Sequence, residues 1–100
     1  MCIHVHIKVI PLGVGTSISD YVAEAIRTLR ELGYSPLVES GETAVEVKDL
    51  KEVGEIVKHV NEKLARMGVR RVLTFVSIDY RTDKARSVED KISIVRSKLK

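Results

Sequence analysis

Apolar and polar side chains alternate without exception from residue 3 to residue 9. The apolar positions are Ile3, Val5, Ile7 and Val9. Because successive side chains of a β-strand point to opposite faces, this pattern predicts a strand that buries one face. The other face carries His4, His6 and Lys8 and is more polar. The chain therefore begins with a strand of a sheet whose two faces differ.

A helical period follows between Ser19 and Leu32. Apolar residues recur there at spacings of three and four, which predicts an amphipathic helix, and Gly33 follows as a stop signal. Ser17 lies three residues before Asp20, and Ser19 immediately precedes the acidic first turn. We therefore expect a serine hydroxyl to cap the start of this helix.

Three further strands are predicted. The runs over residues 34–39 and 43–47 are typical of short strands, joined by a tight turn around Gly41. Pro36 places the first of them near a strand start or at a sheet edge. The fourth strand, residues 72–79, is apolar on both faces through most of its length, so we expect it to be central or covered.

Two further helices are predicted. Asp49 begins the second helix, with Glu52 three residues on in a capping-box arrangement, and Gly68 ends it. Ser87 with Asp90 predicts the start of a third helix. Its apolar residues are expected to face inward: Val88, Ile92, Val95 and Leu99.

The predicted order is βαββαβ with an additional C-terminal helix. This order matches the ferredoxin-like arrangement, an α+β fold in which two helices lie on one face of an antiparallel four-stranded sheet. We expect residues 1–100 to form a single domain. The second sheet face has no cover within the chain except the additional helix, so we expect another copy of the chain to cover it.

The composition limits the class of protein. Seventeen Lys and Arg against fourteen Asp and Glu give a formal charge of +3, which supports only non-specific attraction to an acidic partner. No apolar stretch approaches the roughly 18 residues of a membrane span. His4, His6 and Lys8 interrupt the apolar run that a signal peptide needs. The only cysteine, Cys2, suits a reducing compartment, so we expect a cytoplasmic protein with no membrane partner.

The segment PLGVGTSISDY, residues 11–21, joins the first strand to the first helix and is a candidate phosphate loop. It lacks the lysine of a P-loop, and Ile18 stands where a dinucleotide-binding fingerprint has its third glycine. What remains is a helix N-terminus surrounded by the hydroxyls of Thr16, Ser17 and Ser19, which suits a polar or anionic group. The alternative is that these residues only turn and cap the chain.

Three other kinds of site find less support. His4 and His6 share a strand face and His59 adds a third imidazole, but no Cys or carboxylate stands in an obvious companion position, so we expect no metal. Cys2 has nothing to mark a base beside it. RNA recognition modules share the βαββαβ order, yet the strand over residues 43–47 lacks the aromatic side chains on which bases stack, so we expect no nucleic-acid partner.

Charged residues on two strands have a structural and a ligand-binding interpretation. Asp79 and Arg81, at the end of the fourth strand, form either a structural ion pair or the polar wall of a ligand site. Glu46 points to the face opposite Val45 and Val47. If a second subunit covers that face, the carboxylate needs a partner, and a ligand amine would serve.

Several strings occur in a characteristic order: VIPLG at residues 9–13, TS at 16–17, YVAEAI at 21–26 and RVLTFVSIDYRTD at 71–83. In order and spacing they resemble the small thiamine-binding proteins of the UPF0045 family, and the resemblance covers nearly the whole chain. It implies a ferredoxin-like subunit that assembles into dimers and a homotetramer through its sheets. It also implies binding of thiamine or its hydroxymethylpyrimidine moiety without turnover, as a carrier, buffer or sensor.

Carried over by position, the family pattern implies a set of ligand-binding residues: Thr16, Ser17, Tyr21, Gly41, Thr43, Glu46, Asp79 and Arg81. Under this resemblance Glu46 or Asp79 would accept from the 4-amino group of the pyrimidine or pair with its protonated ring, and Tyr21 or Phe75 would stack on it. We expect no catalytic residue, no metal and no cofactor. The alternative is a structural or regulatory oligomer that binds a different small polar metabolite.

Overall fold

The computed structural model describes residues 2–39, 41–83 and 88–99. The four strands are β1 (Cys2–Leu12), β2 (Leu37–Glu39), β3 (Glu42–Val47) and β4 (Arg71–Arg81). The three helices are α1 (Ser19–Glu31), α2 (Lys51–Arg66) and α3 (Val88–Lys98). The predicted α+β order, βαββαβ with an additional C-terminal helix, is confirmed.

The four strands form one antiparallel sheet in the order β2-β3-β1-β4. β2 begins directly after Pro36 and lies at one edge, as that proline predicts. The prediction that the fourth strand is central or covered is wrong, because β4 is the other edge. Val72 packs against the core, but the other apolar side chains of β4 are 37% to 56% exposed: Leu73, Phe75, Val76, Ile78 and Tyr80. The apolar residues on both faces of the strand indicated that other segments cover it, but the described residues leave most of these side chains exposed.

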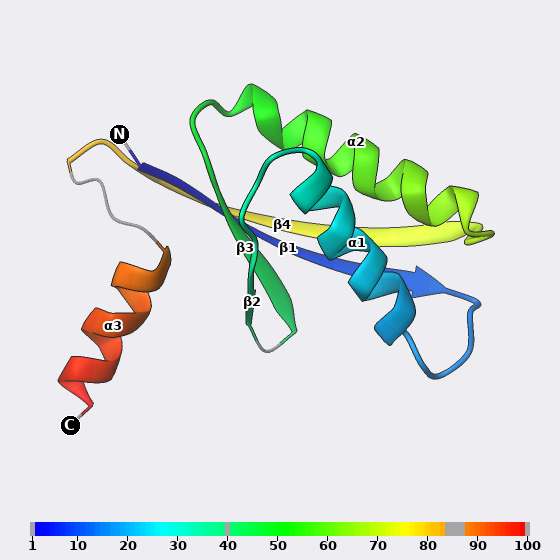
Figure 1. Ribbon diagram of the computed structural model, residues 1–100, viewed down its shortest axis with the longest axis horizontal. Coiled ribbons are helices and arrows are strands. Elements are labelled where there is room, and N and C mark those ends of the chain that lie inside the picture. Colours follow the sequence, from blue (N-terminus) through cyan, green and yellow to red (C-terminus); the bar gives the residue numbers. More distant parts are fainter. Residues whose placement is uncertain (1, 40, 84–87, 100) are drawn as a thin grey trace.

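The hydrophobic core lies between the sheet and the helices α1 and α2, which run side by side across one face of it (Figure 1). The register places Ile3 opposite Val47 and Val5 opposite Val45, so the alternation of β1 continues into β3. From the helices, Leu29, Ile56 and Leu64 pack onto this layer, almost fully buried. Burial of each such side chain stabilises the fold by about 1.5–3 kcal/mol.

The two long helices begin differently. α1 has Ile18 at its N-cap position, and no side-chain hydrogen bond caps it among the described residues. The predicted serine cap is therefore wrong: Ser17 and Ser19 flank the N-cap position without occupying it, and both are exposed. α2 has one half of the expected capping box, because Glu52 Oε2 accepts from the backbone N–H of Asp49 at 2.6 Å, but its N-cap position is Leu50 and not Asp49.

The helix α3 stands apart from α1 and α2, at the end of the sheet where β1 begins (Figure 1). The prediction that its apolar residues face inward fails for Val95 and Leu99, which are 57% and 79% exposed. The predicted cap residue Ser87 lies outside the described residues. No helix in the described ranges has the length and apolar character needed to cross a membrane.

Candidate functional site

A buried histidine lies between two carboxylates on the sheet face opposite α1 and α2. The register places His4 of β1 directly opposite Glu46 of β3 on one side and Asp79 of β4 on the other. His4 is completely buried, and its Nε2 lies 3.7 Å from Glu46 Oε1. The Glu46 side chain is 51% exposed, so it extends from this buried centre towards solvent.

Each of the two charged residues at the end of β4 has its own partner. Asp79 pairs with Lys91 of α3, and this hydrogen bond is the main cause that lowers the pKa of the Asp79 carboxyl. Arg81 makes a two-pronged pair with Asp83, with Nε to Oδ1 and Nη2 to Oδ2 both at 3.0 Å. This geometry favours the structural interpretation of Asp79 and Arg81, because their strongest contacts lie within the chain.

A cavity of about 600 Å³ opens beside Glu46, and we call it the acidic pocket. Its lining is Leu32, Gly33, Tyr34, Ser35, Leu37, Glu46, Lys48, Glu52 and Glu89. The loop after α1, the ends of β2 and β3, the start of α2 and the first turn of α3 therefore meet around one space. Three carboxylates against one lysine make this space attractive to a cation. Its volume lies within the usual range for small-molecule sites.

The wall of the acidic pocket is fixed by Tyr34 and Glu52. The Tyr34 hydroxyl donates to Glu52 Oε1 at 2.7 Å, while Glu52 Oε2 accepts from the backbone N–H groups of Lys48 and Asp49. These bonds, that from Tyr34 first, lower the pKa of the Glu52 carboxyl, since they favour its charged form. Burial, together with this carboxylate, raises the pKa of Tyr34 to about 12. Glu52 is thus a charged, fully engaged part of the wall.

A smaller cavity, of about 250 Å³, lies between α1 and the β2–β3 turn. Gly41 and Thr43 line it, together with Ile18 and Val22 from the start of α1. Gly41 has a φ of 78°, which explains why the turn has glycine there. Most of the other lining side chains are aliphatic, and the charged ones are Lys8, Glu39 and Glu42.

The predicted ligand-binding residues fall into separate groups. Glu46, Asp79 and Arg81 lie at the end of the sheet that holds the acidic pocket, and Gly41 and Thr43 line the smaller cavity. The hydroxyl residues Thr16 and Ser17 are exposed in the loop beyond the far end of β1. Tyr21, in the first turns of α1, packs against the core. Since about 26 Å of strand separates His4 from Leu12, one ligand cannot contact both ends of β1 within one chain.

Most of the acidic pocket could not be predicted from the sequence. The sequence predicted Glu52 as a capping residue, and the same carboxylate also faces the cavity beside Tyr34. No sequence pattern marked Glu89 as a site residue, because it reaches the pocket only through the packing of α3 beside the sheet. The strand register, which places His4 between Glu46 and Asp79, could not be predicted from the sequence pattern of the single strands either.

Two UPF0045 proteins are similar to this chain in sequence. A relative from Methanothermobacter thermautotrophicus, a UPF0045 protein, is 38% identical over 94 residues, covering 93% of this chain and 95% of that protein. A UPF0045 protein of Synechocystis is 31% identical, covering 99% of this chain and 81% of the relative.

Two crystal structures share the fold. The hypothetical protein MJ1052 of Methanocaldococcus jannaschii superimposes with a TM-score of 0.82 at 28% identity, covering 95% of this chain and 96% of that one. A Thermotoga maritima protein, whose name assigns it provisionally to thiamine biosynthesis or salvage, gives a TM-score of 0.79 at 25% identity and covers 96% of this chain and 100% of that one. The sequence profile of the family described as thiamine-binding protein matches residues 5–96. With these matches and this fold, the chain belongs to the thiamine-binding protein family, UPF0045.

Proposed function

We propose that this protein binds thiamine or its hydroxymethylpyrimidine moiety in the acidic pocket, without turning it over. The observation that carries the proposal is the pocket itself: a cavity of about 600 Å³ with three carboxylates and an aromatic ring, in a chain of the thiamine-binding family. The protein would act as a carrier, buffer or sensor of the ligand. Because the charged lining groups are three carboxylates and one lysine, the chemistry of the pocket suits recognition of a cation.

The chemistry of the ligand matches the lining. Thiamine carries a positive thiazolium ring and a pyrimidine with an amino group, so it presents a cation and hydrogen-bond donors. Glu46 and Glu89 line the pocket and are both exposed, so their carboxylates can accept from the amino group or neutralise the positive ring. Tyr34, held by Glu52, also lines the pocket, and its ring would stack on a heteroaromatic ligand or a cation. Asp79 would act indirectly, through His4 and Lys91.

We further propose that the chain self-associates through its sheet into dimers and a tetramer in the cytoplasm. The eleven-residue strand β4 lies at an edge of the sheet and pairs with β1 alone among the described strands, and its side chains include exposed Phe75 and Ile78. A second copy is a natural partner for such an edge, because two copies bury the same patch on each other. In this assembly Thr16 and Ser17 would contact a ligand held by a neighbouring subunit.

The experiment that tests the binding proposal is calorimetric titration of the purified protein with thiamine, hydroxymethylpyrimidine and the thiamine phosphates. We expect saturable binding of at least one of them. We expect Glu46→Gln to weaken it by about ten-fold or more, since a charge-assisted hydrogen bond is worth roughly 1.5–3 kcal/mol. Asp79→Asn should weaken ligand binding less, because Asp79 would act on the ligand only indirectly, through His4. The matched control is Glu55→Gln on α2, whose side chain is 69% exposed and outside the pocket lining.

Absence of heat with every one of these compounds would reject thiamine and favour the alternative, an oligomer that binds a different polar metabolite. Unchanged affinity in Glu46→Gln would remove the acidic pocket as the site even if thiamine binds. The two results are distinct, so the ligand and its location are tested separately.

A further inference from the structure

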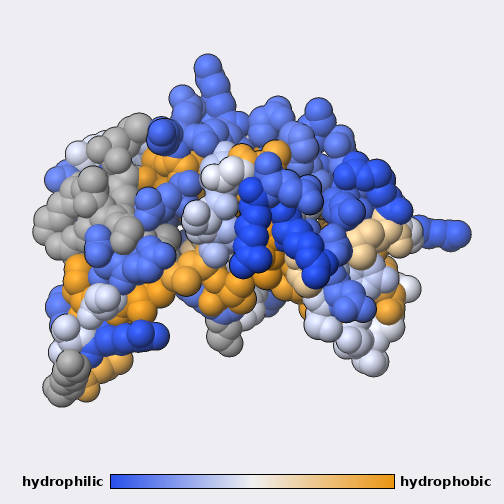
Figure 2. All heavy atoms as spheres, viewed as in Figure 1, coloured by the Kyte–Doolittle hydropathy of each residue, from blue (hydrophilic) through white to orange (hydrophobic). Residues whose placement is uncertain are grey.

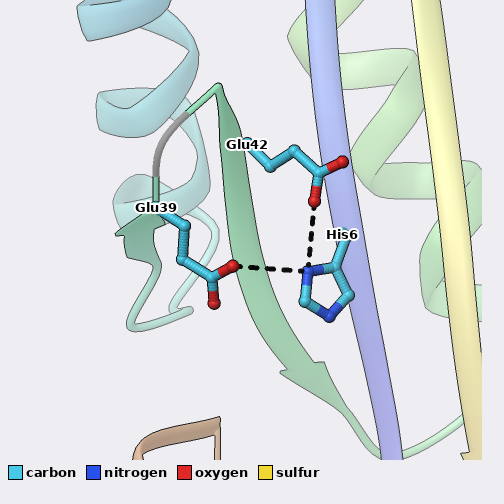
Figure 3. Close-up of side chains that lie close together, drawn as sticks. All are labelled: His6, Glu39 and Glu42. Carbon is cyan, nitrogen blue, oxygen red and sulfur yellow. Dashed lines mark ion pairs between the residues drawn. The ribbon is translucent and has the colours of Figure 1, made fainter. Parts of the chain in front are cut away.

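Three side chains with metal-binding atoms converge on the open sheet face, away from the acidic pocket. His6 from β1, Glu39 from the end of β2 and Glu42 from the start of β3 point towards one another (Figure 3). His6 Nδ1 lies 3.6 Å from Glu42 Oε2 and 4.0 Å from Glu39 Oε2. One ligand atom from each residue can be chosen so that all three lie within 4.8 Å of one another.

The imidazole nitrogen at the centre of this cluster needs a partner. His6 Nδ1 is buried and makes no hydrogen bond within the described residues. A buried nitrogen without a hydrogen bond is costly, so a group that satisfies it would be stabilising. The two carboxylates that face it are partly open to solvent, with Glu39 at 32% and Glu42 at 47% exposure. An ion can therefore reach the nitrogen from the solvent side.

We propose that His6, Glu39 and Glu42 form a binding site for one divalent transition-metal ion of the zinc type. Imidazole nitrogen and carboxylate oxygen are ordinary ligands of Zn²⁺, and three protein ligands leave a fourth position for water. Ligand atoms about 2.1 Å from a tetrahedral ion lie about 3.4 Å apart. The pair at 3.6 Å nearly meets that spacing, and the flexible end of Glu39, now 4.0 Å from the same nitrogen, would move closer to complete it.

The site also explains why the sequence alone pointed away from a metal. The histidines of β1 have no carboxylate nearby in the sequence. The β2–β3 hairpin brings two carboxylates, those of Glu39 and Glu42, close to His6 in the folded sheet. Glu39 and Glu42 are cross-strand partners flanking the hairpin turn, so a bound ion would fasten this hairpin to β1. The site is separate from the acidic pocket, because none of its residues lines that pocket, whereas Glu39 and Glu42 also line the smaller cavity.

Calorimetric titration with zinc chloride tests the site, in a Cys2→Ser background that removes the one thiol. We expect one ion per chain, and a melting temperature that rises with zinc because the ion binds only the folded state. His6→Ala and Glu42→Gln should each weaken zinc binding by about ten-fold or more. The matched control is His59→Ala, since His59 and Glu55 form an exposed histidine–glutamate pair on α2, 3.8 Å apart.

The outcomes separate the proposal from non-specific binding. Loss of zinc affinity and of the zinc-dependent melting shift in the two cluster variants, with His59→Ala unchanged, supports the site. Equal affinity in the parent and in His6→Ala overturns it, as does no stoichiometric binding at all, and the cluster is then an ion pair only. Retained thiamine binding in His6→Ala would show that the variant is folded and that the two sites are separate.

Discussion

The Tyr34 hydroxyl donates a 2.7 Å hydrogen bond to Oε1 of Glu52, and this bond joins the loop after α1 to the first turn of α2. The other oxygen of the same carboxylate closes the start of α2 by accepting two backbone N–H groups. One side chain thus caps a helix, holds an aromatic ring and supplies a negative charge to the acidic pocket. Under the proposed function, stability and ligand recognition are therefore coupled at Glu52.

Replacing Tyr34 by Phe should lower the free energy of unfolding by about 1.5–3 kcal/mol, because the bond that is lost has a charged acceptor. Urea denaturation followed by circular dichroism measures the change. Tyr21→Phe is the matched control, since Tyr21 is also partly buried and its hydroxyl has no hydrogen bond within the described ranges. Equal loss in both variants would show that the Tyr34 bond contributes nothing specific.

The capping carboxylate should make stability depend on acidity. The pKa of Glu52 is lowered from its usual 4.5, so its contribution is present above pH 4.5 and is lost as pH falls through the lower folded value. Glu52→Gln should therefore be less stable than the parent at pH 7, by at least the roughly 1.5–3 kcal/mol of one hydrogen bond to a charged acceptor. The difference should shrink as the solution is acidified to about pH 3. Denaturation midpoints across this range measure it, and a difference that stays constant with pH contradicts the assignment.

The fold could be predicted from the sequence to a greater extent than the site. Local periodicity defines each element, so the alternation of β1 and the period of α1 were sufficient for the order and for the helix-covered face. The acidic pocket depends instead on how separate segments meet, and Glu89 reaches it only through the position of α3. Asp79 illustrates the same limit: the sequence placed it near Arg81, whereas its main partner is Lys91.

The ion pair between Lys91 and Asp79 should hold α3 against the sheet. α3 makes few contacts with the strands, and Val95 and Leu99 remain exposed, so we expect this pair to contribute to its attachment. Lys91→Met should speed amide hydrogen exchange in α3 while leaving α1 and α2 protected. Lys98→Met, in the last turn of the same exposed helix, is the control. Unchanged exchange after Lys91→Met would mean that other contacts position the helix.

The hydrophobic surface of β4 should control self-association. Figure 2 shows hydrophilic residues over α2 and hydrophobic ones over part of α3, on the side of the molecule in view. On β4, Phe75 is 56% exposed and faces away from α1 and α2, opposite Lys8 of β1. Phe75→Glu would place a charge in the proposed interface between two copies, where desolvation opposes burial.

We expect Phe75→Glu to sediment as a single chain at micromolar concentration and the parent protein to sediment as a dimer or tetramer. Leu50→Glu is the matched control, because Leu50 is 48% exposed at the start of α2, on the helix side of the sheet. An unchanged mass in Leu50→Glu with a reduced mass in Phe75→Glu would locate the contact at β4. A parent protein with the mass of one chain would contradict the assembly, and Thr16 and Ser17 would then have no route to a ligand bound beside Glu46.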